Sequence, residues 1–273
     1  GLVGDNRGIL IHCYSIGSVN SNGRAGGLEG RAGGLVGTNF SGDITECYST
    51  GAGRNDRLDR LYPGGDQGGL LGYNDGTVTY CYSTGAVSGT EDVGGLVGEN
   101  GGYVIQCYSN GTVRGYLDVG GLIGNNTVCE MTWESCFCWP GTVISSFWDT
   151  QTSGQATSDG GIGKTTAEMK TKSTFTDAGW DFVGETINGT NDIWSICEGT
   201  NYPRLVWQIP KGDFLCPDGI TIEEDFDYFF DHWGNSNCDS SNGYCDGTDL
   251  DLSGTVDIDD FIILINNWLK ENP

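Results

Sequence analysis

The chain carries little positive charge. Lys and Arg total 13 of 273 residues against 37 Asp and Glu, which gives a formal net charge of −24. Because such an acidic surface repels phosphate backbones, we expect no nucleic-acid partner. There are only two His residues, His12 and His232, and no Ser, His and Asp constellation can be read. No apolar run approaches the roughly 20 residues that cross a bilayer, so we expect no membrane span.

Several features favour an exported protein, extracellular or on the cell surface. Eleven cysteines are many for a cytosolic chain. Four triplets, beginning at Asn39, Asn110, Asn125 and Asn188, match the glycan acceptor pattern, although each equally suits an ordinary turn. The chain opens directly in a repeat with no signal peptide ahead of it, so we expect its start to lie upstream.

Two short blocks recur in the first half of the chain. Gly-Gly-Leu followed by an aliphatic residue and Gly is centred on Leu35, Leu70, Leu96 and Leu122, with a truncated copy at Gly1 to Gly4. Cys-Tyr-Ser follows each, from Cys13, Cys47, Cys81 and Cys107, and Cys136-Phe137 is expected in that role in the last copy. Successive Leu residues are 33, 35, 26 and 26 apart, which predicts extra loops at 20–32 and 54–67.

The repeats predict a mainly β fold, a parallel β-solenoid (β-helix) of about five glycine-rich coils. Short apolar runs bounded by Gly indicate strands, and no single unit could bury its own apolar face. Stacking places Leu, Val and Cys in a common column. The Gly residues are expected at corners with positive φ. A ladder of side-chain amides is expected from one Asn per coil: Asn6, Asn39, Asn74, Asn100 and Asn126.

These blocks resemble the GLUG repeat of bacterial surface and secreted proteins, over about residues 1–143. That resemblance implies a stalk or display region rather than a specific activity. It gives the first of three predicted segments, a solenoid at 1–145.

The second predicted segment, 146–210, is expected to cap the last coil. Thr165 to Glu168 reads as a capping box before a short helix. The aromatic pieces around Trp180, Trp194 and Trp207 favour packing over the open edge, although Trp residues also suit a sugar-binding platform. Gly163-Lys164-Thr165 resembles the end of a phosphate loop, but Ser158 stands where that motif requires Gly, which excludes nucleotide binding.

The sharpest local signal is a run of oxygen-bearing residues near the C-terminus. Counted as a 12-residue loop, ligand positions 1, 3, 5, 7, 9 and 12 hold Asp249, Asp251, Ser253, Thr255, Asp257 and Asp260. Gly254 occupies position 6, where such a loop turns sharply, and a helix is expected from Phe261 to Leu269. Carboxylate and carbonyl oxygens suit hard cations, so the sequence predicts a site for one calcium ion.

A loop that ends in Asp and runs straight into one helix resembles the dockerin module, a small α-helical, EF-hand-like domain. Phe226 to Trp233 repeats the pattern of Phe261 to Trp268, as the two halves of a dockerin would. When Asp225 is aligned with Asp260, Phe214, Cys216 and Ile222 fall at ligand positions 1, 3 and 9, so only the second half is expected to bind calcium. The resemblance implies a third segment, 211–273, and a cohesin-like receptor.

The cysteines divide into two groups. Those in the repeats are expected to be small buried hydrophobes rather than redox or metal groups. The other six permit 15 pairings, among which we predict Cys129 with Cys138, and Cys216 with Cys238 or Cys245. Neither Cys136 to Cys138 nor Cys238 to Cys245 has the spacing of an ordinary zinc site.

The sequence thus favours a non-enzymatic extracellular structural or display protein. Its C-terminal module is expected to hold a protein partner, or other copies of the chain in a fibre. One alternative is a polysaccharide-active β-helix enzyme, with Asp66, Asp92 and Asp118 as an acidic column. Against it, these acids recur as equivalent positions rather than differently tuned partners. The other alternative is an adhesin that binds glycans through Trp and Tyr.

Overall fold

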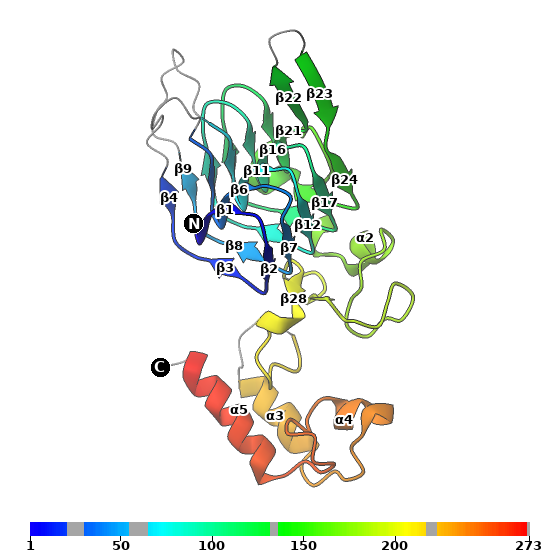
Figure 1. Cartoon of the computed structure of the whole chain (residues 1–273). Helices are drawn as coiled ribbons and strands as arrows, with labels where there is room; N and C mark the ends of the chain where they lie inside the picture. Colours follow the sequence, from blue (N-terminus) through cyan, green and yellow to red (C-terminus); the bar gives the residue numbers. More distant parts are fainter. Residues whose placement is uncertain (21–29, 55–64, 132–135, 217–222, 272–273) are drawn as a thin grey trace. The chain divides into compact units, whose positions relative to one another are not determined.

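The computed structural model describes residues 1–20, 30–54, 65–131, 136–216 and 223–271 (Figure 1). The chain divides into two compact units, which we name the solenoid unit, Gly1–Trp180, and the C-terminal unit, Asp181–Pro273. The predicted boundary between a cap at 146–210 and a dockerin-like segment at 211–273 remains a prediction.

The solenoid unit is built from short parallel strands that form five ladders. Strands of each ladder stack one coil above the next (Figure 1). The first ladder is β1 (Val3–Asn6), β6 (Val36–Asn39), β11 (Leu71–Asn74), β16 (Val97–Asn100) and β21 (Ile123–Asn125). The second is β5 (Ala32–Gly33), β10 (Gln67–Gly68), β15 (Val93–Gly94) and β20 (Val119–Gly120). The third is β2 (Ile9–Ile11), β7 (Asp43–Thr45), β12 (Thr77–Thr79), β17 (Tyr103–Ile105) and β24 (Thr142–Ile144).

Two further ladders complete the coils. One is β3 (Tyr14–Ser15), β8 (Tyr48–Ser49), β13 (Tyr82–Ser83), β18 (Tyr108–Ser109), β25 (Phe147–Asp149) and β26 (Ile162–Lys164). The other is β4 (Val19–Asn20), β9 (Gly53–Arg54), β14 (Val87–Ser88) and β19 (Val113–Arg114). Each repeat position pairs with its counterpart in the next coil, as Val78 pairs with Ile44 and Val104. The mainly β fold and its stacked parallel strands therefore confirm the predicted solenoid.

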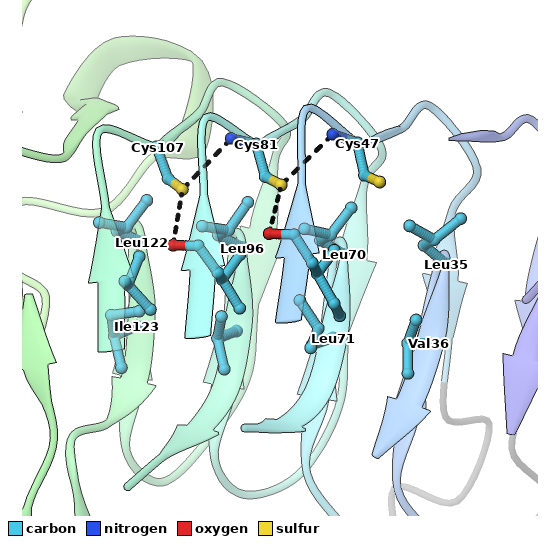
Figure 2. Packing of buried hydrophobic residues seen from close by; sticks show 14 of the residues in the cluster. Leu35, Val36, Cys47, Leu70, Leu71, Cys81, Leu96, Cys107, Leu122 and Ile123 are labelled. Carbon is cyan, nitrogen blue, oxygen red and sulfur yellow. Dashed lines mark hydrogen bonds between the residues drawn. The ribbon is translucent and has the colours of Figure 1, made fainter. Parts of the chain in front are cut away.

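Equivalent side chains form columns inside the stack, as the sequence predicted. Figure 2 shows the Leu and Cys columns side by side. Leu70, Leu96 and Leu122 are fully buried, and so are Cys47, Cys81 and Cys107. The amide of Cys47 donates to Cys81 Sγ at 3.4 Å, and the amide of Cys81 donates to Cys107 Sγ at 3.3 Å (Figure 2). The thiols therefore satisfy backbone groups of the preceding coil while they fill the core.

The Asn column is also confirmed. In each interior coil the Asn Nδ2 donates to Oδ1 of the next Asn, at 2.9 Å from Asn39 to Asn74 and 2.8 Å from Asn74 to Asn100. Asn39, Asn74 and Asn100 are fully buried. In the folded chain Asn39 is thus buried and hydrogen-bonded within the column, and its glycosylation stays a prediction.

The predicted role of the repeat glycines is wrong. Among the described residues of 1–145, positive φ belongs to non-glycine residues such as Glu46, Tyr80 and Gln106, each directly before a column Cys. The glycines are required by space. A Cβ on Gly34 would collide with Ser49 Oγ and the carbonyl of Gly69 in the next coil. The Gly-Gly pairs thus allow backbones to approach closely, whereas the left-handed corner accepts several residue types.

The predicted place of Cys136 in the last coil is also wrong. Cys136 lies in β23 (Cys136–Pro140), which pairs antiparallel with β22 (Thr127–Met131) as a hairpin inserted into that coil. Ser146 takes the column position, because its Oγ accepts from the amide of Cys107 at 3.0 Å. Phe147 correspondingly pairs with Tyr108. Serine can replace the thiol here because its hydroxyl accepts the same bond.

Three short helices follow the strands of the last coil: α1 (Thr150–Ser153), η1 (Glu168–Lys170) and α2 (Lys172–Thr176). Glu168 accepts from the amide of Thr165 at 2.8 Å, which confirms the capping box. Trp180 is fully buried, packs on Phe147 and Phe175, and donates from Nε1 to the carbonyl of Ser145. The predicted packing role of this Trp is therefore confirmed.

The C-terminal unit is mostly irregular and helical. Its regular elements are β27 (Trp194–Ser195), β28 (Arg204–Leu205), η2 (Val206–Gln208), α3 (Glu223–Asp231), η3 (Ser240–Asn242), α4 (Gly243–Asp246) and α5 (Ile258–Glu271). Phe229 of α3 and Leu264 of α5 are fully buried in one cluster with Cys238, Leu250 and Val256. The loop predicted to bind calcium leads into α5 from this core.

Candidate metal centre

Three of the predicted calcium ligands lie together. Carboxylate oxygens of Asp249, Asp251 and Asp260 all lie within 4.8 Å of one another. Within the described part of the chain, these three side chains form a group that could hold a metal ion. Asp249 is 1% exposed and Asp260 is fully buried, whereas Asp251 is exposed. Because like charges at such a separation repel, a hard divalent cation fits this donor set.

Backbone amides hold the buried carboxylates in place. Asp249 accepts from the amides of Ser253 at 3.0 Å and Gly254 at 2.9 Å, which closes the turn around the loop glycine. Gly254 has φ +98°, a conformation that favours glycine. Asp260, in the first turn of α5, accepts from the amides of Asp251 at 3.0 Å and Asp257 at 2.8 Å. The two ends of the loop are thereby held together across the acidic cluster.

The other three predicted ligands lie in the same loop with bonds of their own. Ser253 Oγ donates to the carbonyl of Thr255 at 3.2 Å, and hydrogen bonds from Ser253 lower the pKa of Asp251. Asp257 lies outside the group of three carboxylates and caps α5, because its Oδ1 accepts from the amide of Asp259 at 2.9 Å. Coordination by Ser253, Thr255 and Asp257 therefore stays a prediction.

The first half of the C-terminal unit contains an acid that matches Asp260. Asp225 is 1% exposed and lies in α3, as Asp260 lies in α5. Its Oδ1 accepts from the amides of Phe214 at 2.8 Å and Leu215 at 3.1 Å. Asp225 thus accepts from two backbone amides through Oδ1, and Asp260 likewise accepts from two amides. Ile222, predicted at ligand position 9, lies outside the described residues.

The disulfides correct part of the predicted pairing. Cys129–Cys138 links the two strands of the hairpin, as predicted. Cys216 pairs with Cys197, and Cys238 pairs with Cys245, so the predicted bond from Cys216 to either of them is wrong. With three disulfides the chain fits an exported protein.

Sequence reasoning missed the residues that support the loop from behind. The amide of Cys238 donates to the carbonyl of Gly254 at 3.1 Å, and Lys211 Nζ donates to the carbonyl of Leu250 at 2.8 Å. Both bonds join backbone of the loop to groups distant in sequence. A lone Lys or a Cys of unknown pairing carries no local signal for such a role.

A second group of acids lies in the solenoid unit. Asp66, Asp92 and Asp118 lie directly before β10, β15 and β20, and their backbone carbonyls accept from equivalent amides of the neighbouring coil. The carboxylates are unequal: Asp66 accepts from Arg31 Nε at 2.8 Å, whereas burial raises the pKa of Asp92 to about 7. Burial also raises the pKa of nearby Glu99 to about 8. Their catalytic role stays a hypothesis from the sequence.

Comparison with known proteins supports the repeat resemblance over part of the chain. The GLUG motif matches residues 29–52. A protein of Evansella cellulosilytica, provisionally named a Gly-rich membrane protein, is 45% identical over 64 residues, which cover 23% of this chain and 6% of that protein. The chain thus spans a small fraction of the length of this relative. No solved structure matches the chain. Within the part of the chain that the structure describes, no helix has the length and apolar character to cross a membrane.

Proposed function

We propose that this chain is a non-enzymatic structural or display protein of the cell surface or extracellular matrix, attached to a protein partner through a calcium-stabilised, dockerin-like module. The observation that carries the proposal is the meeting of Asp249, Asp251 and Asp260 within 4.8 Å, in a loop with calcium-ligand spacing. The stacked coils, whose columns are occupied by packing and hydrogen bonds, supply a rigid display element.

In this proposal one calcium ion joins both ends of the loop. Asp249 and Asp251 would hold it from the start of the loop and Asp260 from the first turn of α5. The ion offsets the repulsion among three carboxylates, two of them buried. Binding therefore stabilises the position of α5 against the core of the C-terminal unit. Ser253, Thr255 and Asp257 are proposed to complete the oxygen shell.

A single ion is proposed because the first half lacks oxygen-bearing side chains at the matching positions. Phe214 stands at position 1, and Cys216 at position 3 is bonded to Cys197. The paired halves nevertheless support the dockerin-like assignment, since α3 and α5 each carry a buried Asp near the helix start.

Attachment is supported by large apolar side chains that remain exposed on the two helices. Phe230 is 50% exposed on α3, and Ile258 and Ile262 are 55% and 50% exposed on α5. Exposed apolar groups of this size on a small unit are typical of protein interaction sites. A cohesin-like receptor is the proposed partner, and another copy of the chain is the alternative occupant.

Isothermal titration with calcium tests the metal site. We expect one site in the wild type and none in Asp249→Ala, because the first ligand is removed. Asp259→Ala is the matched control: it removes an exposed acid of the same loop that lies outside the cluster, and it should retain the site. An unchanged isotherm for Asp249→Ala refutes the loop assignment, and two sites in the wild type contradict the single ion. Cryo-electron microscopy of the calcium-loaded chain separates self-assembly from a dispersed protein that awaits a receptor.

A further inference from the structure

A short disulfide loop lies directly against the proposed calcium loop. Cys238 and Cys245 are bonded across a separation of 7 residues. They are only 6% and 8% exposed, and they belong to the same buried cluster as Leu250 and Val256 of the calcium loop. The bridge is therefore part of the core on which the calcium loop rests.

The Cys238 side of the bridge pairs with the middle of the calcium loop. The amide of Cys238 donates to the carbonyl of Gly254 at 3.1 Å, and Ser236 forms an antiparallel bridge with Thr255. The amide of Val256 donates to the carbonyl of Asn235 at 2.9 Å. These bonds fix the backbone of the loop at its central turn.

The Cys245 side holds the start of the calcium loop. The carbonyl of Cys245 accepts from Thr248 twice, from Oγ1 at 2.6 Å and from the amide at 3.2 Å. The amide of Asp249 donates to the carbonyl of Tyr244 at 3.1 Å. Since Asp249 also accepts from the amide of Gly254, the contacts form a closed circuit that runs through the S–S bond.

The backbone around Cys245 needs this constraint. From Gly243 to Gly247 every residue has positive φ, and three of the five, Tyr244, Cys245 and Asp246, are not glycine. L-residues disfavour the left-handed conformation, so a free chain would leave it. The carbonyls of Tyr244 and Cys245, which position Asp249 and Thr248, would turn away with it.

We propose that the Cys238–Cys245 bridge is a positioning element that sets the calcium affinity of the Asp249–Asp260 loop, so that reduction of the bridge weakens calcium binding. The inference rests on the proposed calcium site and adds redox control to it. The bridge touches the backbone that presents Asp249 and Gly254, and acts on the ion through them.

Calcium titration of the full chain tests this with Cys238→Ser/Cys245→Ser. Supporting groups of a metal site typically change affinity by about 10- to 100-fold, and a loss of that size is expected. The matched control is Cys129→Ser/Cys138→Ser, which removes a disulfide of similar span from the solenoid hairpin and should bind calcium as the wild type does. Far-ultraviolet circular dichroism verifies that the helices persist.

A reciprocal measurement on the wild-type chain covers the case in which the double variant fails to fold. Glutathione buffers reduce the bridge: its two sulfurs gain two electrons and two protons, and two glutathione molecules are oxidised to one glutathione disulfide. If the oxidised form binds calcium about tenfold more tightly, saturating calcium must stabilise the bridge by the same factor, about 30 mV for a two-electron couple. Thiol trapping followed by mass spectrometry measures the reduction midpoint of the Cys238–Cys245 bridge with and without calcium.

The outcomes are distinct. Weaker binding by the serine pair, or a calcium-dependent midpoint, supports the inference. The inference is overturned if the folded serine pair binds calcium with the same affinity as the wild type, or if calcium does not shift the reduction midpoint of the bridge. Either result leaves the calcium site itself intact. A wild-type chain that binds no calcium overturns both the proposed function and this inference.

Discussion

Asn74→Ala removes the middle amide of the Asn column. In the folded chain Asn74 Nδ2 donates to Asn100 Oδ1 at 2.8 Å, and Asn74 Oδ1 accepts from the amides of Asn39 and Gly76 at 2.9 and 3.2 Å. In the variant, Asn39 Nδ2 keeps its bond to the carbonyl of Gly42, whereas the Oδ1 of Asn100 and the backbone amide of Gly76 stay buried without these partners. Each such group costs about 1–3 kcal/mol, so we expect a loss of about 2–6 kcal/mol in the free energy of unfolding.

Urea unfolding of the chain, followed by circular dichroism, measures this loss. Asn6→Ala serves as a graded comparison, because Asn6 lies at the end of the column and serves one buried neighbour, Asn39, at 2.8 Å. Its cost should be about 1–3 kcal/mol. The reasoning fails if Asn74→Ala lowers the free energy of unfolding no more than Asn6→Ala does. In that case an interior Asn contributes no more to stability than the Asn at the end of the column.

Two further predictions concern the same unit. Burial raises the pKa of Asp92 to about 7 from an ordinary value of 3.8, so the folded state holds the proton more tightly than the unfolded state. Stability of the solenoid unit should therefore fall as pH rises from about 4 to about 7, and urea midpoints at pH 5 and 8 should differ less in Asp92→Asn; an equal difference contradicts this. Gly34→Ala should lower the thermal unfolding temperature, because its Cβ would collide with Ser49 and Gly69. Gly17→Ala should unfold at the same temperature as the wild type, because a Cβ at that position meets nothing within 4 Å.

The sequence predicts the solenoid well because each coil repeats the same physical task. A residue that recurs at a fixed place in every repeat must stack on itself, and this places the Asn, Leu and Cys columns without any knowledge of the coil's path. The error at Cys136 has the same origin. Cys136-Phe137 imitates the repeat locally, but the hairpin at 127–140 moves it out of phase, and Ser146 fills the column through a hydrogen bond that the repeat pattern does not encode.

The candidate metal centre is predictable in part. Asp249, Asp251 and Asp260 follow from the spacing of a loop that closes on itself, because local chain geometry brings these positions together. The groups behind the loop do not follow from it. The pairing of Cys238 and the bond from Lys211 to the carbonyl of Leu250 depend on how the C-terminal unit packs its segments together. The spacing within the loop carries no information on that packing.

The amides of the Asn column all point the same way. From Asn6 to Asn100 each side chain donates toward the next coil, and Asn126 ends the series by donating to the carbonyl of Gly141 at 3.0 Å. The aligned dipoles polarise one another along the stack. A coil duplicated between Asn39 and Asn100 would find a donor on one side and an acceptor on the other. The column can therefore be extended only by repeats of the same polarity.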